Sequence, residues 1–179
     1  MTVDSGPPGL QPDAEEPGSR DAPPGTLISG FVHAQVNVSD LERSIAFYEM
    51  LGFEVISKGT IKDPGIFAAL GLEGGTRLRG AFLRIPGRST KVTPMIDMIQ
   101  FVDPPPTGRP YPSLNHLGIG RLCFQVDDIE AAAERLRSAG VELVGPVGEL
   151  VTRGGGMRSK VLCFRDPDGT VLEYAEVNV

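Results

Sequence analysis

The stretch HAQVNVSDLERSIAFYEMLGFEV, residues 33–55, decides the fold, because a later part of the chain repeats its pattern. The segment RLCFQVDDIEAAAERLRSAGVELV, residues 121–144, aligns with it without a gap at a constant offset of 88 residues (121 − 33). Identical residues occupy these aligned positions: Val38 and Val126, Asp40 and Asp128, Glu42 and Glu130, Gly52 and Gly140, Glu54 and Glu142. Such internal repetition indicates two copies of one supersecondary unit.

Each copy has the local signals of a strand, a capped helix and a second strand. Ser39 with Glu42 has capping-box spacing, and Asp127 with Glu130 repeats it. Apolar residues follow at helical spacing: Leu41, Ile45, Tyr48 and Leu51 in the first copy, and Ile129, Ala133, Leu136 and Ala139 in the second. Gly52 and Gly140 then stand where a left-handed helix end favours glycine.

Further strand-like segments follow both helices. They cover residues 53–57, 77–85 and 94–102 in the first copy, and 141–143, 160–165 and 170–177 in the second. A DPDG turn at residues 166–169 joins the last two. The sequence therefore predicts an α+β fold in residues 28–179. It has two βαβββ modules, about 28–103 and about 118–179. The Pro-rich segment 104–117 between them is predicted to be a linker, because prolines cannot donate to a sheet ladder.

The N-terminal residues 1–27 have a different composition. They are rich in proline and nearly lack large apolar side chains, so they cannot bury enough surface to offset the entropy of ordering. A disordered tail is predicted. The tail carries five acids against Arg20, so the formal charge of −6 falls to about −2 over the rest of the chain. This charge balance is not that of a nucleic-acid-binding protein.

The cysteine content and the hydropathy of the sequence bear on the cellular compartment of the protein. Cys123 and Cys163 are far apart and form no CxxC pair, so neither a disulfide framework nor a thiolate metal cluster is indicated. No run approaches the roughly 18 apolar residues of a membrane span, and the N-terminal segment lacks the pattern of a signal peptide. A cytoplasmic protein without membrane contact is predicted.

Four segments carry a family resemblance: FVHAQVNVSDLERSIAFYEMLGFEV, MIDMIQFVDPP, GIGRLCFQVDDIEAAAERLRSAGVELV and FRDPDGTVLEYAEV. Together they resemble the vicinal oxygen chelate (VOC) superfamily, which includes glyoxalase I, methylmalonyl-CoA epimerase and bleomycin resistance proteins, over residues 30–179. The resemblance implies a cupped, barrel-like mixed sheet with the helices outside, a homodimer and a small-molecule substrate. Because the superfamily contains isomerases, lyases, dioxygenases, thiol transferases and antibiotic-binding proteins, it indicates the fold more strongly than the function.

The resemblance also implies a divalent metal site (Zn, Ni, Co, Mn or Fe) with one residue from the first and one from the last strand of each module. These positions hold His33, Asp97, Arg121 and Glu173, with aspartate where glutamate is usual. Arg121 departs from the pattern, because a guanidinium cannot coordinate a metal. Two accounts follow. Either His33, Asp97 and Glu173 hold the ion while Arg121 binds a substrate oxygen, or the metal has been lost and the cup only binds.

Other residues are placed near this site by strand alternation. Gln35 and Asn37 share the face of His33, and Cys123 and Gln125 share the face of Arg121, so they are predicted to line the cavity. His116 is a conceivable substitute ligand. Its odd offset from Arg121 puts it on the other strand face, so it would have to reach in from a loop.

The carboxylates point to a reaction. Asp97 in MIDMI and Glu173 in TVLEY interrupt apolar strands, where an unpartnered carboxylate is costly, whereas a lone strand histidine such as His33 is more often structural. A metal beside two carboxylates suits proton removal alpha to a carbonyl, with Glu173 as base and Arg121 on the developing oxyanion. We therefore expect a metal-dependent epimerase or isomerase acting on a hydroxyketone, cyclitol ketone or acyl thioester.

Three alternatives have different requirements. A glyoxalase-like lyase would normally have four ligands, and the chain offers three. A metal-free binding protein of the antibiotic-resistance type needs no ligand set, although flat drugs are usually held by aromatic stacking and the chain has no Trp and only three Tyr. An extradiol dioxygenase needs two histidines and a carboxylate on iron, and the two histidines of this chain are not at the required positions.

Overall fold

The computed structural model describes residues 27, 28, 30–87, 94–151 and 158–178. The chain divides into two units, residues 1–31 and 32–179, and every helix and strand below belongs to the second unit. The predicted tail, residues 1–27, lies outside the described residues except for Leu27.

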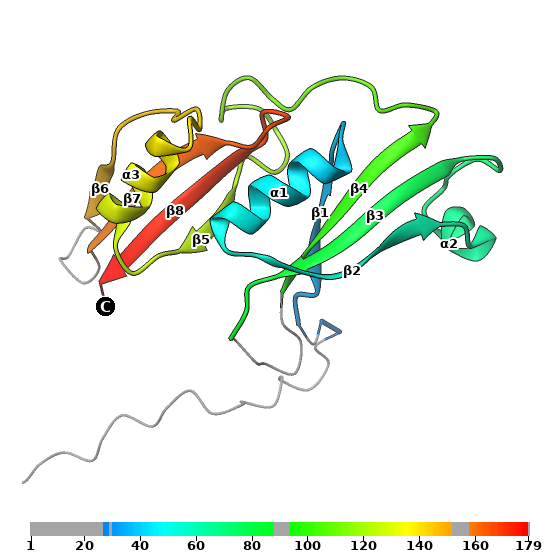
Figure 1. Cartoon of the computed structure of the whole chain (residues 1–179), viewed down its shortest axis with the longest axis horizontal. Coiled ribbons are helices and arrows are strands. Elements are labelled where there is room, and N and C mark those ends of the chain that lie inside the picture. The colour runs from blue at the N-terminus through cyan, green and yellow to red at the C-terminus, as the bar shows by residue number, and fades with distance from the viewer. Residues whose placement is uncertain (1–26, 29, 88–93, 152–157, 179) are drawn as a thin grey trace, which may run out of the picture. The chain divides into compact units, whose positions relative to one another are not determined.

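Residues 32–179 fold as two similar modules (Figure 1). The first contains β1 (His33–Asn37), α1 (Leu41–Leu51), β2 (Glu54–Ile61), α2 (Pro64–Ala69), β3 (Arg77–Arg84) and β4 (Met95–Asp103). The second contains β5 (Leu122–Gln125), α3 (Ile129–Ser138), β6 (Gly148–Val151), β7 (Arg158–Arg165) and β8 (Val171–Asn178). The predicted α+β fold of two βαβββ modules is confirmed.

The two sheets have the same topology. Their strand orders are β1-β4-β3-β2 and β5-β8-β7-β6. In each sheet the first strand pairs in parallel with the last, and the other neighbours are antiparallel. The sheets remain two separate four-stranded sheets, so the mixed sheet is open and does not close into a barrel.

One expected strand and one unexpected helix distinguish the structure from the sequence prediction. Residues 141–143 form only an isolated bridge, between Leu143 and Phe164, and the second strand of this module is β6 instead. Pro146 explains the interruption, because it has no N–H to continue the ladder. The helix α2 was not predicted, although Asp63 caps it and Pro64 occupies its first turn, a favourable combination.

The helix caps also differ from the predicted capping boxes, which are wrong by one residue. Asp40 caps α1 by accepting from the N–H of Arg43, and Asp128 caps α3 by accepting from the N–H of Ala131. The hydroxyl of Ser39 makes other contacts instead, because it donates to Asp168 and accepts from the Arg43 guanidinium at 2.9 Å. Gly52, at φ 108°, ends α1 in the left-handed conformation as predicted.

The helices α1 and α3 share one hydrophobic core with both sheets. Their buried apolar residues pack in the same cluster as Met98 of β4 and Leu172 of β8, and they are Leu41, Ile45, Tyr48, Ile129, Ala133 and Leu136. The Tyr48 hydroxyl donates to Asp166 of the second module at 3.4 Å. The modules are therefore joined by packing and by a buried hydrogen bond.

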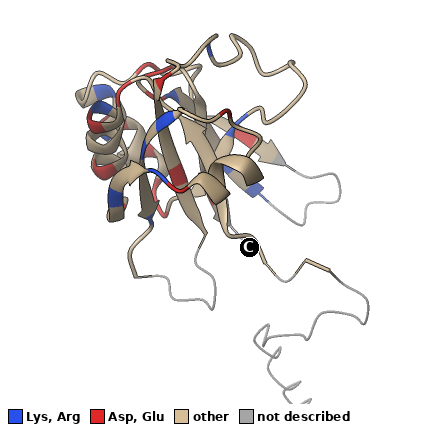
Figure 2. Ribbon diagram, turned by 90° about the vertical axis from the view of Figure 1, so that its right-hand side faces the viewer, with Lys and Arg blue, Asp and Glu red and all other residues tan. Residues whose placement is uncertain are grey.

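The surface of this unit carries charges of both signs. Acidic and basic residues are interspersed along the ribbon (Figure 2). Glu42, for example, is bound by Lys58 and Arg79 at 3.0 and 2.6 Å. Within the described ranges, none of the helices has the length and apolar character needed to cross a membrane.

Candidate functional site

The first module brings His33 and Asp97 together. The two residues lie on the neighbouring parallel strands β1 and β4, where Gln35 is the register partner of Asp97. His33 Nε2 lies 3.8 Å from Asp97 Oδ2, and the Asp97 side chain is only 14% exposed. The Phe82 ring of β3 packs beside His33, with the ring centroids 5.9 Å apart.

This environment alters the acidity of Asp97. Burial raises its pKa above the ordinary value, and the charge of a protonated His33 opposes that shift. Asp97 is therefore a partly desolvated carboxylate with an imidazole close by, which is the type of group that accepts a proton during catalysis.

The second module pairs Arg121 with Glu173. Arg121 directly precedes β5, and its Nε lies 2.7 Å from Oε2 of Glu173 in β8, whose side chain is 8% exposed. The thiol of Cys163 donates to the same oxygen at 3.5 Å. Cys123 and Cys163 flank Glu173 as its register partners on β5 and β7. Glu173 is thus neutralised by a cation from its own module.

The two thiols of this cluster are protonated at neutral pH. Cys123 is partly exposed, but desolvation of its thiol, followed by the hydrogen bond and negative charge of Glu173, raises its pKa to about 11. The same causes raise the pKa of Cys163. Because the thiolate is the nucleophilic and metal-binding form, neither cysteine is activated for such a role.

The four residues implied by the family pattern thus form two pairs, one on each sheet. In the part of the chain that the structure describes, no three or more His, Cys, Asp or Glu side chains are grouped so that they could hold a metal ion. The donor chemistry still fits a divalent ion, since an imidazole and two carboxylates are common ligands and Asp97 receives no hydrogen bond from the described residues. The ligand set His33, Asp97 and Glu173 remains a prediction.

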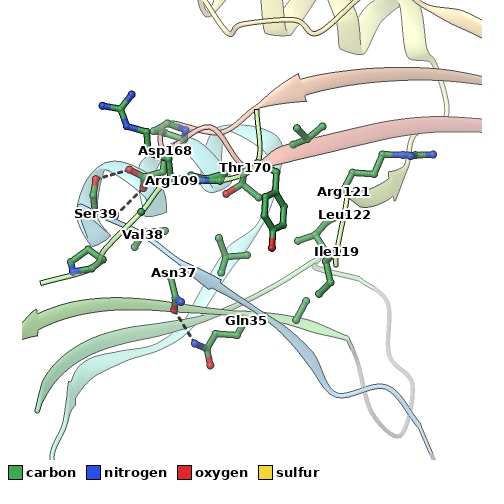
Figure 3. Close-up of a pocket in the computed structure, with 18 of the residues that line it drawn as sticks. Gln35, Asn37, Val38, Ser39, Arg109, Ile119, Arg121, Leu122, Asp168 and Thr170 are labelled. Atoms are coloured by element: carbon green, nitrogen blue, oxygen red, sulfur yellow. Dashed lines mark hydrogen bonds between the residues drawn. The ribbon is translucent and has the colours of Figure 1, made fainter. Parts of the chain in front are cut away.

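A cavity of about 750 Å³ has Arg121 of the second pair in its lining. Its walls come from β1, from the linker, from the start of β5 and from the turn before β8. Gln35, Asn37 and Arg121 are the predicted site residues that line it. Figure 3 shows Gln35 and Asn37 side by side on β1, where the Gln35 amide donates to Asn37 Oδ1 at 2.9 Å.

The remaining predicted residues lie outside the lining of this cavity. His33, Asp97 and Glu173 form the pairs described above, and Cys123 and Gln125 are exposed on β5. His116 stacks on Tyr111 in the linker, with the ring centroids 4.9 Å apart and the planes at 8°. His116 makes no recorded contact with Asp97 or Glu173 among the described residues, and its role as a substitute ligand remains a prediction.

The sequence interpretation missed the residues at one end of the cavity. Ser39, Arg109, Asp168 and Thr170 all line it. Asp168 accepts from the Ser39 N–H at 3.0 Å, from the Ser39 hydroxyl at 2.5 Å and from Arg43 at 2.6 Å, which fixes the turn of one module to the helix start of the other. The DPDG turn was visible in the sequence, but its partner across the chain was not.

Comparison with known proteins agrees with this architecture. A glyoxalase family protein of Bacillus cereus superposes with a TM-score of 0.73 at 23% identity, covering 88% of this chain and 100% of the other. A glyoxalase family protein of Enterococcus faecalis superposes with a TM-score of 0.54 at 26% identity, covering 84% of this chain and 100% of the other. A glyoxalase I mutant of Zea mays superposes with a TM-score of 0.55 at 21% identity, covering 82% of this chain and 44% of the other. No curated protein matches the sequence.

The family assignment comes from the sequence itself. The family model of the Glyoxalase/Bleomycin resistance protein/Dioxygenase superfamily matches residues 30–174, which is most of the chain. These residues hold both modules, both side-chain pairs and the cavity. The chain is a member of the glyoxalase, bleomycin resistance protein and dioxygenase superfamily, the VOC superfamily.

Proposed function

We propose that the chain is an epimerase or isomerase that removes a proton alpha to a carbonyl group of a small oxygenated metabolite, such as a hydroxyketone, a cyclitol ketone or an acyl thioester. The observation that supports this most directly is the state of Asp97. It is 14% exposed, it lies beside His33, and burial raises its pKa. A carboxylate whose pKa is moved toward neutrality is suited to accept a proton from carbon.

The second carboxylate has a different environment, and this affects the assignment of the base. Glu173 is held by Arg121 at 2.7 Å and by the Cys163 thiol. Accepting a proton would cost Glu173 its ion pair at 2.7 Å, whereas Asp97 would lose only the longer contact of 3.8 Å with His33. The contacts therefore favour Asp97 as the base and Glu173 as the residue that positions Arg121. Glu173 remains the alternative base.

Arg121 supplies positive charge to the cavity wall. Its side chain is 45% exposed and lines the cavity, so a substrate oxygen can approach it. A guanidinium donates several hydrogen bonds and stays charged at neutral pH, which suits the stabilisation of an enolate oxygen. In the metal-dependent alternative, in which Glu173 is the base, a divalent ion held by His33, Asp97 and Glu173 would supply electrophilic stabilisation of the same oxygen.

The test is exchange of solvent deuterium into the substrate. The protein is incubated in deuterated water with hydroxyketones, cyclitol ketones and 2-methyl acyl thioesters, and the alpha proton is followed by NMR. Asp97→Asn should slow the exchange by about 10²-fold or more, the usual contribution of a general base. Asp103→Asn is the matched control, because Asp103 is an exposed aspartate on the same strand that pairs with Arg77.

The exchange assay distinguishes Asp97 from Glu173 as the general base. If Glu173→Gln abolishes exchange and Asp97→Asn does not, Glu173 is the base. If no compound of the panel exchanges its alpha proton, the epimerase proposal fails.

A metal-free binding protein is the second candidate. The Arg121–Glu173 pair supports it, because a guanidinium stands at a position that a metal ligand would occupy and already neutralises one carboxylate. A chain that binds ligands tightly, retains no metal after reconstitution and exchanges no alpha proton would favour this candidate. A glyoxalase-like lyase would instead convert a hemithioacetal of glutathione and a 2-oxoaldehyde, a reaction that is followed directly by thioester absorbance.

A further inference from the structure

We infer that Arg109 is the anchor for an acidic group of the ligand, so that the cavity takes a small molecule with a carboxylate or phosphate at one end and an apolar body at the other. This inference rests on the proposed function in naming its substrate class. It assigns a specificity-determining role to a linker residue outside both side-chain pairs.

The first argument is charge compensation. Three arginines line the cavity: Arg43, Arg109 and Arg121. Arg43 is bound to Asp168 at 2.6 Å and Arg121 to Glu173 at 2.7 Å. Arg109 has no ion pair or hydrogen bond with any residue that the structure describes. A guanidinium is charged at any ordinary pH, so Arg109 brings an uncompensated positive charge to the cavity wall.

The nearest acid does not cancel this charge. Figure 3 shows Arg109 with Asp168 and Thr170 at one end of the cavity. The Asp168 carboxylate already accepts three hydrogen bonds, from the Ser39 backbone, the Ser39 hydroxyl and Arg43. Residues 28–179 have a formal net charge of about −2, so the positive charge at this position is not part of a generally basic surface.

Prolines near Arg109 restrict the backbone of the linker. Gly108, which precedes it, has φ 79°, a left-handed conformation that glycine adopts without strain. Pro106 and Pro110 restrict the chain on either side, because each proline fixes its own φ. A cationic side chain on a restrained backbone loses less entropy on binding an anion than one on a flexible loop.

The opposite end of the cavity has the complementary character. Ile119 and Leu122 line it there, together with the stem of Arg121, while the amides of Gln35 and Asn37 lie between the two ends (Figure 3). Ile119 is 74% exposed, so a ligand that covers it gains apolar burial. An acid at one end and an apolar body at the other end would match these walls.

Binding measurements without turnover test this inference. The probes are 4-methyl-2-oxopentanoate, its methyl ester and isopentyl phosphate, titrated calorimetrically and by NMR shift changes. We expect the parent protein to bind an acidic probe more tightly than the ester. Arg109→Gln should weaken acid binding by about tenfold or more, the usual scale of a hydrogen bond to a charged group, and leave ester binding unchanged. The acidic probe that binds more tightly shows whether the carboxylate or the phosphate is recognised.

The controls keep the outcome interpretable. Arg137→Gln removes an exposed arginine of α3 that pairs with Glu134, away from the cavity, and should change nothing. Arg109→Lys should retain part of the affinity, and thermal melts should show that all three variants fold. Equal binding of acid and ester, unchanged acid affinity in Arg109→Gln, or no binding of any probe would overturn the inference. None of these results depends on the deuterium exchange that tests the proposed reaction.

Discussion

Ser39 and Asp168 lie 129 residues apart in sequence and are joined by two hydrogen bonds, of 3.0 and 2.5 Å, at the end of the cavity. Burial tends to raise the pKa of Asp168, but the hydrogen bonds from Ser39 and the charge of Arg43 outweigh it and hold this pKa below the ordinary value. The Asp168 side chain is 14% exposed, so solvent weakens these contacts only in part.

This contact predicts a pH dependence of stability. A group whose pKa is lowered by folding stabilises the protein above its unfolded pKa, near 3.9, and this stabilisation is lost as the pH falls through the folded value. Asp168→Asn should therefore lower the free energy of unfolding at pH 7 by about 1–3 kcal/mol. It should also reduce the loss of stability below about pH 4. Urea unfolding from pH 2 to pH 7 measures both effects. If Asp168→Asn lost stability at low pH as steeply as the parent protein, the contribution of Asp168 to the pH dependence would be contradicted.

The buried hydroxyl of Tyr48 tests the connection between the modules. Tyr48 is fully buried and donates to Asp166 at 3.4 Å. Tyr48→Phe removes the hydrogen bond alone and should cost about 1 kcal/mol, whereas Tyr48→Ala also leaves a cavity and should cost about 3–5 kcal/mol. Chemical unfolding gives both values. Equal losses in the two variants would mean that packing of the ring contributes little.

The helix caps give a comparison between sequence and structure. Asp128→Ala should destabilise the protein by about 1 kcal/mol, because the N–H of Ala131 loses its acceptor. Asp127→Ala should cost much less, since Asp127 is exposed and does not cap α3 in the structure. Thermal melts of the two variants decide the matter, and the reverse order would restore the predicted capping box at Asp127.

Metal content tests the ligand prediction. The protein, reconstituted with a divalent ion and dialysed, should retain about one ion per chain if His33, Asp97 and Glu173 act as ligands. His33→Ala should abolish retention, and Arg121→Ala should leave it unchanged because a guanidinium is not a ligand. Elemental analysis measures the content. Stoichiometric retention in His33→Ala would show that any bound ion lies elsewhere.

The fold could be predicted because the sequence pattern of the βαβββ module occurs twice in the chain. The aspartates at positions 40 and 128 and the glycines at 52 and 140 occur at the same offset, and both helices form behind them. The strand over 141–143 was mispredicted, because its apolar residues suggested a strand but Pro146 interrupts the ladder just after it. The helix α2 was missed because it is six residues long, too short for a visible periodicity.

The site was predictable only in part. Strand alternation placed Gln35 and Asn37 together, and they line the cavity. It could not show that Arg121 is bound to Glu173, because an ion pair between a strand start and a distant strand has no local sequence signal. Arg109 was overlooked for a related reason: a proline-rich linker without periodicity carries no information about which way its side chains point.

The linker occurs once in a chain whose modules occur twice, and it forms one wall of the cavity. The internal pseudo-symmetry of the fold is therefore broken at the place where a ligand would sit. A molecule that entered a symmetric cleft could bind equally well in two opposite senses. If Arg109 anchors an acidic group, as we infer, a ligand would have a single preferred direction, and the two faces of its reacting carbon would then meet different walls.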